Sequence, residues 1–171
     1  TARSYGDHLR LYDAQMLKNM TYALIDMAIE LRLRLGLLDD TFTLKLDSTN
    51  HEQSGKKIEG AEMNYKGQWG LDSLLAFDEL GFQYWVETRK GAAFTSNGAA
   101  EVIDAVLRRL PRKVKRDRGV AESGFCNNAF FRGNFTAGAR FIWAVRSVMY
   151  RRLLARVTHW AEAEKSLLHD G

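Results

Sequence analysis

The chain has a single cysteine, a single proline and no long run of apolar residues. The one cysteine, Cys126, can neither close an internal disulfide nor supply the thiolates of a zinc cluster. A membrane-spanning helix needs about 20 consecutive apolar residues, and the absence of such a run excludes one. Because the chain also lacks a signal-like apolar segment at its start, we expect a reducing cytoplasm.

Several standard catalytic motifs are missing as well. There is no glycine-rich phosphate loop and no G-x-G-x-x-G nucleotide fingerprint. The four histidines are scattered without the spacing of metal ligands. Cys126 follows Phe125 and suits a buried structural thiol, while Ser73 and Ser123 lie in no nucleophile elbow. The carboxylates are the remaining candidates for chemistry.

The composition is that of one globular domain. The chain has 171 residues, of which 46% are hydrophobic and 27% charged, both ordinary values. The formal net charge is only +4, but one segment is strongly basic. Its basic residues are Arg108, Arg109, Arg112, Lys113, Lys115, Arg116 and Arg118. Such a cluster is typical of a protein that binds a phosphate-backbone partner; a merely solvated face fits equally well.

The hydrophobic pattern predicts a long first helix and then a run of strands. Apolar residues recur every three or four positions over residues 13–35, and Gly36 stands where the helix would stop. The expected apolar face of this helix is Leu17, Met20, Leu24, Ala28, Leu31 and Leu35. From residue 41 the period changes to two, which predicts a strand ending at Asp47. Two more strands, over residues 70–77 and 82–88, would complete an antiparallel meander.

The second half of the chain alternates helix and strand. Asn97 is the expected N-cap of a helix that ends at Pro111. The remaining elements are a strand over residues 113–121, a short helix over 125–135, a strand over 140–146 and a helix over 148–160. Three antiparallel strands followed by αβαβ predict an α/β fold: a ribonuclease H-like mixed sheet of about five strands with flanking helices. We expect a helical lead-in over residues 1–38, a core over 39–160 and a C-terminal tail over 161–171.

Two carboxylates stand at the expected ends of strands. Asp47 is followed by small polar residues, and Glu122 comes just after the fourth strand. If the first and fourth strands are neighbours, both carboxylates converge on one edge of the sheet, where they could hold magnesium ions. Asp47 alone would be interpreted as a turn residue. Asp117 is offset by five from Glu122, so it belongs to the opposite face of that strand.

Other candidates have a structural interpretation. Asp72 and Asp78 are flanked by apolar strand residues, which favours pairing with lysine or arginine over a catalytic role. Four aromatic residues at strand spacing could stack on bases, but packing within the sheet is the better interpretation. They are Tyr65, Trp69, Tyr84 and Trp85.

Three motifs in this order carry a family resemblance: LDST at residues 46–49, YKGQWGLDSL at 65–74 and ESGFCN at 122–127. With the run from Arg140 to Trp160, they resemble the catalytic domain of bacterial DDE-type insertion-sequence transposases. The family is the one numbered thirteen-eighty, also called the group-one DDE transposase domain. The resemblance covers nearly the whole chain and identifies it as a catalytic-core fragment.

The resemblance implies a DNA transposase core that cleaves and joins transposon-end DNA with Mg²⁺, for which Mn²⁺ can substitute. It implies three catalytic and metal-binding acids, of which the first two map onto Asp47 and Glu122. The partners it implies are double-stranded DNA, as transposon ends and target, and a second copy in a homodimer on that DNA. The implied location is the bacterial cytoplasm, in association with the nucleoid.

The sequence departs from the family pattern at two points. Glu122 stands where the family usually has aspartate, and the third acid lies beyond the end of this chain. Glu162 and Glu164 are the only late glutamates, and neither takes that role. An alternative is therefore a catalytically incomplete DNA-binding or assembly module that retains the fold. A third hypothesis is an ordinary cytoplasmic α/β domain with a solvated basic segment.

Overall fold

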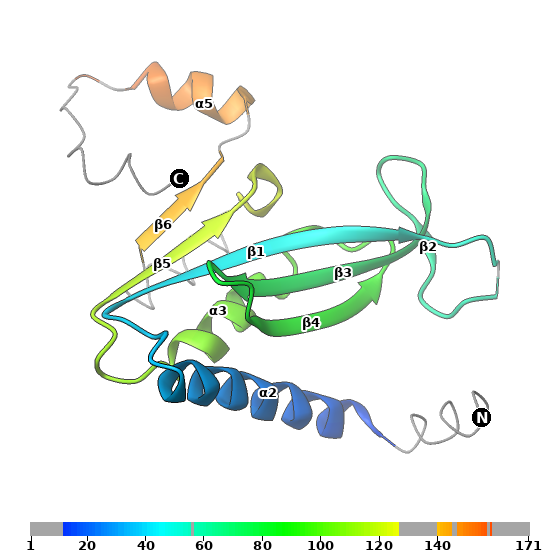
Figure 1. Cartoon of the computed structure of the whole chain (residues 1–171). Coiled ribbons are helices and arrows are strands. Elements are labelled where there is room, and N and C mark those ends of the chain that lie inside the picture. Colours follow the sequence, from blue (N-terminus) through cyan, green and yellow to red (C-terminus); the bar gives the residue numbers. More distant parts are fainter. Residues whose placement is uncertain (1–11, 56, 127–139, 145–146, 157, 159–171) are drawn as a thin grey trace.

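The computed structural model describes residues 12–55, 57–126, 140–144, 147–156 and 158. Along the chain the elements are α2 (Ala14–Arg34), β1 (Thr41–Glu52), β2 (Glu62–Met63), β3 (Trp69–Asp78), β4 (Gln83–Lys90), α3 (Ala99–Leu107), β5 (Arg116–Ala121), the 3₁₀ turn η1 (Ser123–Phe125), β6 (Arg140–Trp143) and α5 (Ser147–Leu154). Figure 1 shows α2 and α3 on one side of the sheet and α5 beyond β6.

One mixed sheet organises the fold. Its strand order is β2-β3-β1-β5-β6, and β4 also pairs with β3. The pairs β1–β3 and β3–β4 are antiparallel, whereas β5 is parallel to β1 and β6 is parallel to β5. The antiparallel meander is thus followed by two parallel strands, the first reached through α3. This order confirms the predicted ribonuclease H-like fold; the two-residue β2 is a strand beyond the five expected.

The bounds of α2 agree with the prediction. The Asp13 carboxylate accepts a hydrogen bond from the Met16 amide at 2.7 Å and caps the start of the helix. After the helix, Gly36 takes a φ of +67°, a left-handed conformation that glycine adopts without a steric penalty.

The predicted apolar face of α2 is wrong. The side chains that turn toward the sheet are Ile25, Ile29 and Arg32, all at most 5% exposed, whereas most of the leucines and methionines expected inside are about half exposed. The helix carries two apolar stripes, one of isoleucines and one of leucines and methionines. Arg32 lies on the isoleucine side, so it can pair with Asp78 of β3 only when the isoleucine stripe faces the sheet. The leucine pattern contained no signal for that choice.

The hydrophobic core lies between the sheet and the two helices. Phe42, Leu44 and Leu46 alternate along β1 and are at most 6% exposed, because every second strand residue faces the same side. The stripe predicted for α3 is confirmed, with Val102 and Val106 fully buried. The N-cap is Gly98 at φ +79° rather than the expected Asn97.

The first strand is longer than the sequence indicated. Alternation of apolar and polar residues stops at Asp47, but β1 continues to Glu52 because β3 pairs with it from Leu44 to Glu52. Asp47 is therefore inside a strand and does not terminate it. In the other half, the predicted strand over residues 140–146 is seen as β6, and part of the last helix as α5. Residues 127–135 of the expected short helix lie outside the described residues, as do 145–146 of the predicted strand, 157 and 159–160 of the last helix and the predicted tail over 161–171.

Across the part of the chain that the structure describes, no helix combines the length and the apolar character needed to cross a bilayer.

Candidate functional site

Asp47 lies on β1 where the neighbouring strand β5 ends. The parallel pairing of β1 with β5 stops at Leu46, opposite Ala121, while β1 continues alongside β3. Strand alternation places Asp47 on the face opposite the buried Leu46. Its Oδ1 atom accepts a hydrogen bond from the Ser48 amide at 2.7 Å, which holds the carboxylate against the strand.

Glu122 occupies the matching position on β5. It directly follows Ala121, keeps an extended backbone with φ −73° and ψ 173°, and precedes the η1 turn. Since Ala121 is buried and Glu122 is exposed, Glu122 belongs to the same face of the sheet as Asp47. The expected position just beyond the fourth strand is confirmed.

The topology thus brings the two predicted carboxylates to one place. Each directly follows the last paired residue of its strand, Leu46 on β1 and Ala121 on β5, at an edge where adjacent strands lie about 4.8 Å apart. Neither carboxylate has an ion-pair partner among the described residues. In the same part of the chain, no group of three or more His, Cys, Asp or Glu side chains is placed to hold a metal ion. The described site is therefore a pair of carboxylates.

A buried arginine supports the backbone beneath Asp47. The side chain of Arg89 on β4 is only 7% exposed. It donates through Nε to Asp72 of β3 at 2.7 Å and through Nη2 to Ser48 Oγ at 3.1 Å. Ser48 Oγ in turn donates to Asp72 at 2.8 Å. One guanidinium therefore fixes three adjacent strands immediately next to Asp47.

The same guanidinium also holds the loop between β4 and α3. Its Nη1 donates to the carbonyl oxygens of Thr95 at 3.3 Å and Asn97 at 2.5 Å. Thr95 packs against the η1 turn: a Cβ added at Gly124 would lie 2.8 Å from Thr95 Cγ2 and 3.1 Å from Glu122 Oε1. The Thr95 side chain would have to shift to admit a side chain at position 124, so the loop that Arg89 anchors packs closely against the η1 turn that follows Glu122.

Sequence reasoning missed Arg89. It predicted that Asp72 pairs with some basic residue, which the structure confirms, and Asp78 likewise pairs with Arg32. Charged residues alternate along β4, which indicates that Glu87 and Arg89 share one face of the strand. The alternation does not indicate that this face is the buried one. Of the aromatic residues, Tyr84 and Trp85 are buried as expected, whereas Tyr65 is 88% exposed.

The basic segment lies at the other end of these strands. Lys115 donates its amide to the Asp40 carbonyl at 2.8 Å, next to the start of β1. From Thr41 to Asp47 the strand covers six residue steps, or about 20 Å. The structure therefore does not bring the basic segment and the carboxylate pair into contact.

Part of that segment is engaged within the protein. Arg108 forms an ion pair with Asp104 at 2.6 Å, and Arg109 pairs with Asp26 at 3.2 Å while stacking on the ring of Tyr22. Three further side chains are exposed on the connection to β5: Arg112, Lys113 and Lys115. Arg118 on β5 is half-buried, and the side chains of Arg116 and Asp117 lie outside the described set.

The donor set fits a hard divalent cation. Carboxylate oxygens are the ligands that Mg²⁺ and Mn²⁺ prefer, and a pair at a strand edge leaves positions for water and phosphate oxygens. Because Asp47 and Glu122 are accessible from one face, a phosphodiester could approach both. The arrangement is suited to metal-assisted chemistry on a phosphate ester.

No family model matches the sequence, and no curated protein matches it. Among solved structures, the chain is similar to a piggyBac transposase in a synaptic complex with hairpin DNA, with a TM-score of 0.42 and 11% identity over 70% of this chain and 26% of that one. It is also similar to the Mos1 mariner paired-end complex with Mn, with a TM-score of 0.40 and 12% identity over 87% of this chain and 53% of that one.

The Mos1 strand transfer complex gives a TM-score of 0.37 and 13% identity over 86% of this chain. The chain spans about a quarter of the piggyBac chain and about half of the Mos1 chains. The strand order and pairing described above are what identify the fold.

Proposed function

We propose that this chain is the core of a DDE-type transposase of a bacterial insertion sequence. In the complete protein it would cleave and transfer transposon-end DNA in the nucleoid, acting as a homodimer on double-stranded DNA. Asp47 and Glu122 would be its catalytic and metal-binding residues. The motifs LDST and ESGFCN support this proposal because they carry the family resemblance and contain these two acids.

One observation carries the proposal. Asp47 and Glu122 are far apart in sequence, yet each directly follows the last residue pair, Leu46 and Ala121, at the carboxyl end of the β1–β5 pair. They also share the face opposite the hydrophobic core. Structural carboxylates of this fold, such as Asp72 and Asp78, are instead paired with arginine. Asp47 and Glu122, the two that the resemblance assigns to chemistry, have no ion-pair partner among the described residues.

The reaction would proceed in two displacements. Water adds to phosphorus, the P–O3′ bond breaks, and the 3′ oxygen leaves as a hydroxyl. That hydroxyl then attacks a phosphorus of the target strand, forming a new phosphodiester and releasing another 3′ hydroxyl. Divalent cations, when bound, stabilise the attacking and leaving oxygens. The two carboxylates would hold the cations, and Ser48 and Arg89 would keep the Asp47 backbone in place.

The basic segment would bind the phosphate backbone without reading bases. Its exposed members, Arg112, Lys113 and Lys115, begin about 20 Å from the carboxylate pair along β1. That length corresponds to about six base pairs of duplex. A duplex reaching from one end of the strands to the other would therefore contact both regions.

The test is a Mn²⁺ titration followed by broadening of amide signals. We expect selective broadening near Asp47 and Glu122, and loss of both effects in Asp47→Asn. Asp39→Asn is the matched control, because Asp39 is an exposed carboxylate before the start of β1. Unchanged signals near both acids at millimolar Mn²⁺ would contradict the proposed metal site.

A second candidate is a DNA-binding or assembly module that has lost the chemistry. Two observations favour it: glutamate at position 122 in place of the family's aspartate, and a described site with only two carboxylates. If the chain is such a module, the wild type and the Asp47→Asn variant should bind plasmid DNA with equal affinity, and neither should nick the plasmid in the presence of Mg²⁺. Nicking that Asp47→Asn abolishes would reject the module.

A further inference from the structure

The outward face of α2 is apolar along its whole length. The leucines and methionines of this face are between 47% and 64% exposed although they belong to a packed helix: Met16, Leu17, Met20, Leu24, Met27, Leu31 and Leu35. Soluble monomers rarely leave a contiguous patch of this kind uncovered. A helix that is apolar on two faces buries both when it is fully assembled.

The outward side chains follow a heptad repeat. Leu17, Leu24 and Leu31 are seven residues apart, and Met20 and Met27 lie three positions after the first two. These are the a and d positions of a coiled-coil seam. The buried stripe of Ile25, Ile29 and Arg32 falls on the b and f positions, so packing on the sheet leaves the seam free to meet another helix.

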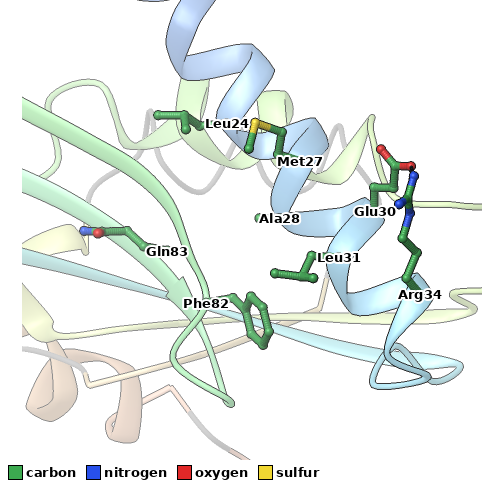
Figure 2. Close-up of a pocket in the computed structure, with 8 residues that line it drawn as sticks. All are labelled: Leu24, Met27, Ala28, Glu30, Leu31, Arg34, Phe82 and Gln83. Carbon is green, nitrogen blue, oxygen red and sulfur yellow. Dashed lines mark hydrogen bonds and ion pairs between the residues drawn. The ribbon is translucent and has the colours of Figure 1, made fainter.

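A groove runs beside the seam. It has a volume of about 440 Å³ and lies between α2 and the start of β4. Leu24, Met27, Ala28 and Leu31 line it from the helix, Phe82 from the turn before β4 and Gln83 from the start of β4, as Figure 2 shows. Side chains of a helix laid over the seam would enter this groove, which makes seam and groove one continuous surface.

We infer that α2 docks against α2 of a second copy of this chain, with the two helices antiparallel. The seam is self-complementary: with Leu24 opposite the partner's Met27, Met20 meets the partner's Leu31 and Leu17 meets the partner's Arg34. The arrangement has two-fold symmetry, so each copy presents the same surface and the assembly closes as a dimer.

Arg34 selects the antiparallel direction. It occupies the d position after Met27 and pairs with Glu30 of its own helix at 2.5 Å. In a parallel dimer the two Arg34 side chains would face each other across the seam and repel. In the antiparallel dimer the aliphatic stem of Arg34 covers the partner's Leu17 while its charged group remains in water.

The size of the surface sets the strength of the dimer. A 21-residue helix is about 31 Å long and about 10 Å wide, so its footprint is roughly 300 Å². A stable interface buries about 800 Å² from each partner. The helix pair and groove together fall short of that, so the dimer is weak and depends on concentration. The α2–α2 contact would supply an interface for the homodimer of the proposed function. The contact itself is independent of that function, and only its role on DNA rests on the proposed function.

The first test is sedimentation equilibrium of the full chain at about 10–200 µM, without DNA or metal. We expect a reversible monomer–dimer equilibrium that Leu24→Glu/Met27→Glu weakens at least tenfold. Met63→Glu is the matched control, because Met63 is 55% exposed on β2, away from this face. A wild-type chain that stays monomeric, or a double variant that dimerises unchanged, would overturn the inference. Either result leaves the Mn²⁺ test of the carboxylate pair unaffected.

The second test fixes the direction. In a Cys126→Ser background, Leu17→Cys and Arg34→Cys chains are oxidised separately and as a mixture. The antiparallel seam brings position 17 of one copy to position 34 of the other, within the reach of a disulfide. We expect disulfide-linked dimers in the mixture and few in either chain alone. Efficient linkage of one variant to itself would show a parallel or different contact and overturn the inference.

Discussion

Arg32 of α2 and Asp78 of β3 form an ion pair at 2.8 Å in which neither side chain is more than 2% exposed. Asp78 also accepts hydrogen bonds from the Tyr84 hydroxyl and from the amides of Leu80 and Phe82, each at 2.9 Å. The carboxylate is thus surrounded by four donors from three parts of the chain. This contact fixes which face of α2 turns toward the sheet.

Replacing Arg32 with methionine should destabilise the protein by about 3 kcal/mol, because it leaves the Asp78 carboxylate buried without a counter-charge. Urea unfolding measures the change. Arg108→Met is the control: Arg108 belongs to an exposed pair with Asp104, so its loss should cost less than about 1 kcal/mol. Equal effects of the two substitutions would contradict the role given to the buried pair.

Stability should fall at alkaline pH because of Tyr84. Burial, and then the hydrogen bond to Asp78, raise the pKa of the Tyr84 phenol above its ordinary value of 10.0. Above about pH 10 the unfolded chain loses this proton while the folded chain keeps it, so the stabilisation is complete below pH 10 and declines above it. Tyr84→Phe should flatten the pH dependence of the urea midpoint between pH 9 and 11, whereas Tyr65→Phe, at an exposed position, should not.

Arg89→Lys should cost about 2 kcal/mol even though it keeps the charge. A lysine ammonium cannot reach Asp72, Ser48 and the carbonyls of Thr95 and Asn97 at once, since those contacts need the planar fork of a guanidinium. Thermal unfolding checks the prediction, with Lys90→Arg as the control on the exposed neighbouring position. A melting temperature unchanged by Arg89→Lys would show that the network contributes little.

Gly124→Ala should weaken Mn²⁺ binding at the carboxylate pair. The added Cβ would meet Thr95 Cγ2 at 2.8 Å and Glu122 Oε1 at 3.1 Å, so one of the two must move. The amide broadening near Glu122 should need several times more Mn²⁺. Thr95→Ser in the same chain removes the clashing methyl group and should restore part of the affinity; absence of any restoration would point to a cause other than this contact.

Glu122→Asp tests the departure from the family pattern. The extra methylene of glutamate displaces the carboxylate by about 1.5 Å, and an error of about 1 Å can cost on the order of a hundredfold in rate. If the proposed function holds, the aspartate variant should nick plasmid DNA faster than the wild type with Mg²⁺. Equal or slower nicking would mean that Glu122 is already correctly placed or has no part in the reaction.

Much of the fold could be predicted because the hydrophobic period changes at clear positions. Alternation along β1 and the spacing of Val102, Ile103 and Val106 each indicate a single buried face. The buried face of α2 could not be predicted, since its two apolar stripes are equivalent by pattern and the choice depends on Asp78, far away in the sequence. The extension of β1 to Glu52 also depends on a distant partner, β3.

The candidate site likewise has residues that the sequence could predict and one that it could not. Asp47 and Glu122 could be found because small polar residues follow one and a glycine turn follows the other. The support from Arg89 could not, because an arginine in an alternating charged strand resembles any exposed residue. Which side of β4 faces Asp72 is decided by the register of the β3–β4 pair, which the sequence does not contain.

The parallel β1–β5 pair has a consequence for the order of folding. Asp47 and Glu122 are some 75 positions apart in the chain, whereas β1, β3 and β4 are joined by nearer connections, over residues 53–68 and 79–82. Local pairings form quickly and distant parallel ones slowly, because the intervening chain must first be ordered. We expect the meander to form early and the carboxylates to meet late. A newly made chain would therefore form most of its sheet before Asp47 and Glu122 are close enough to bind a metal ion. Mutations that slow the packing of α3 on the sheet would delay the pairing of β5 with β1, and with it the formation of the carboxylate pair, without altering the final geometry.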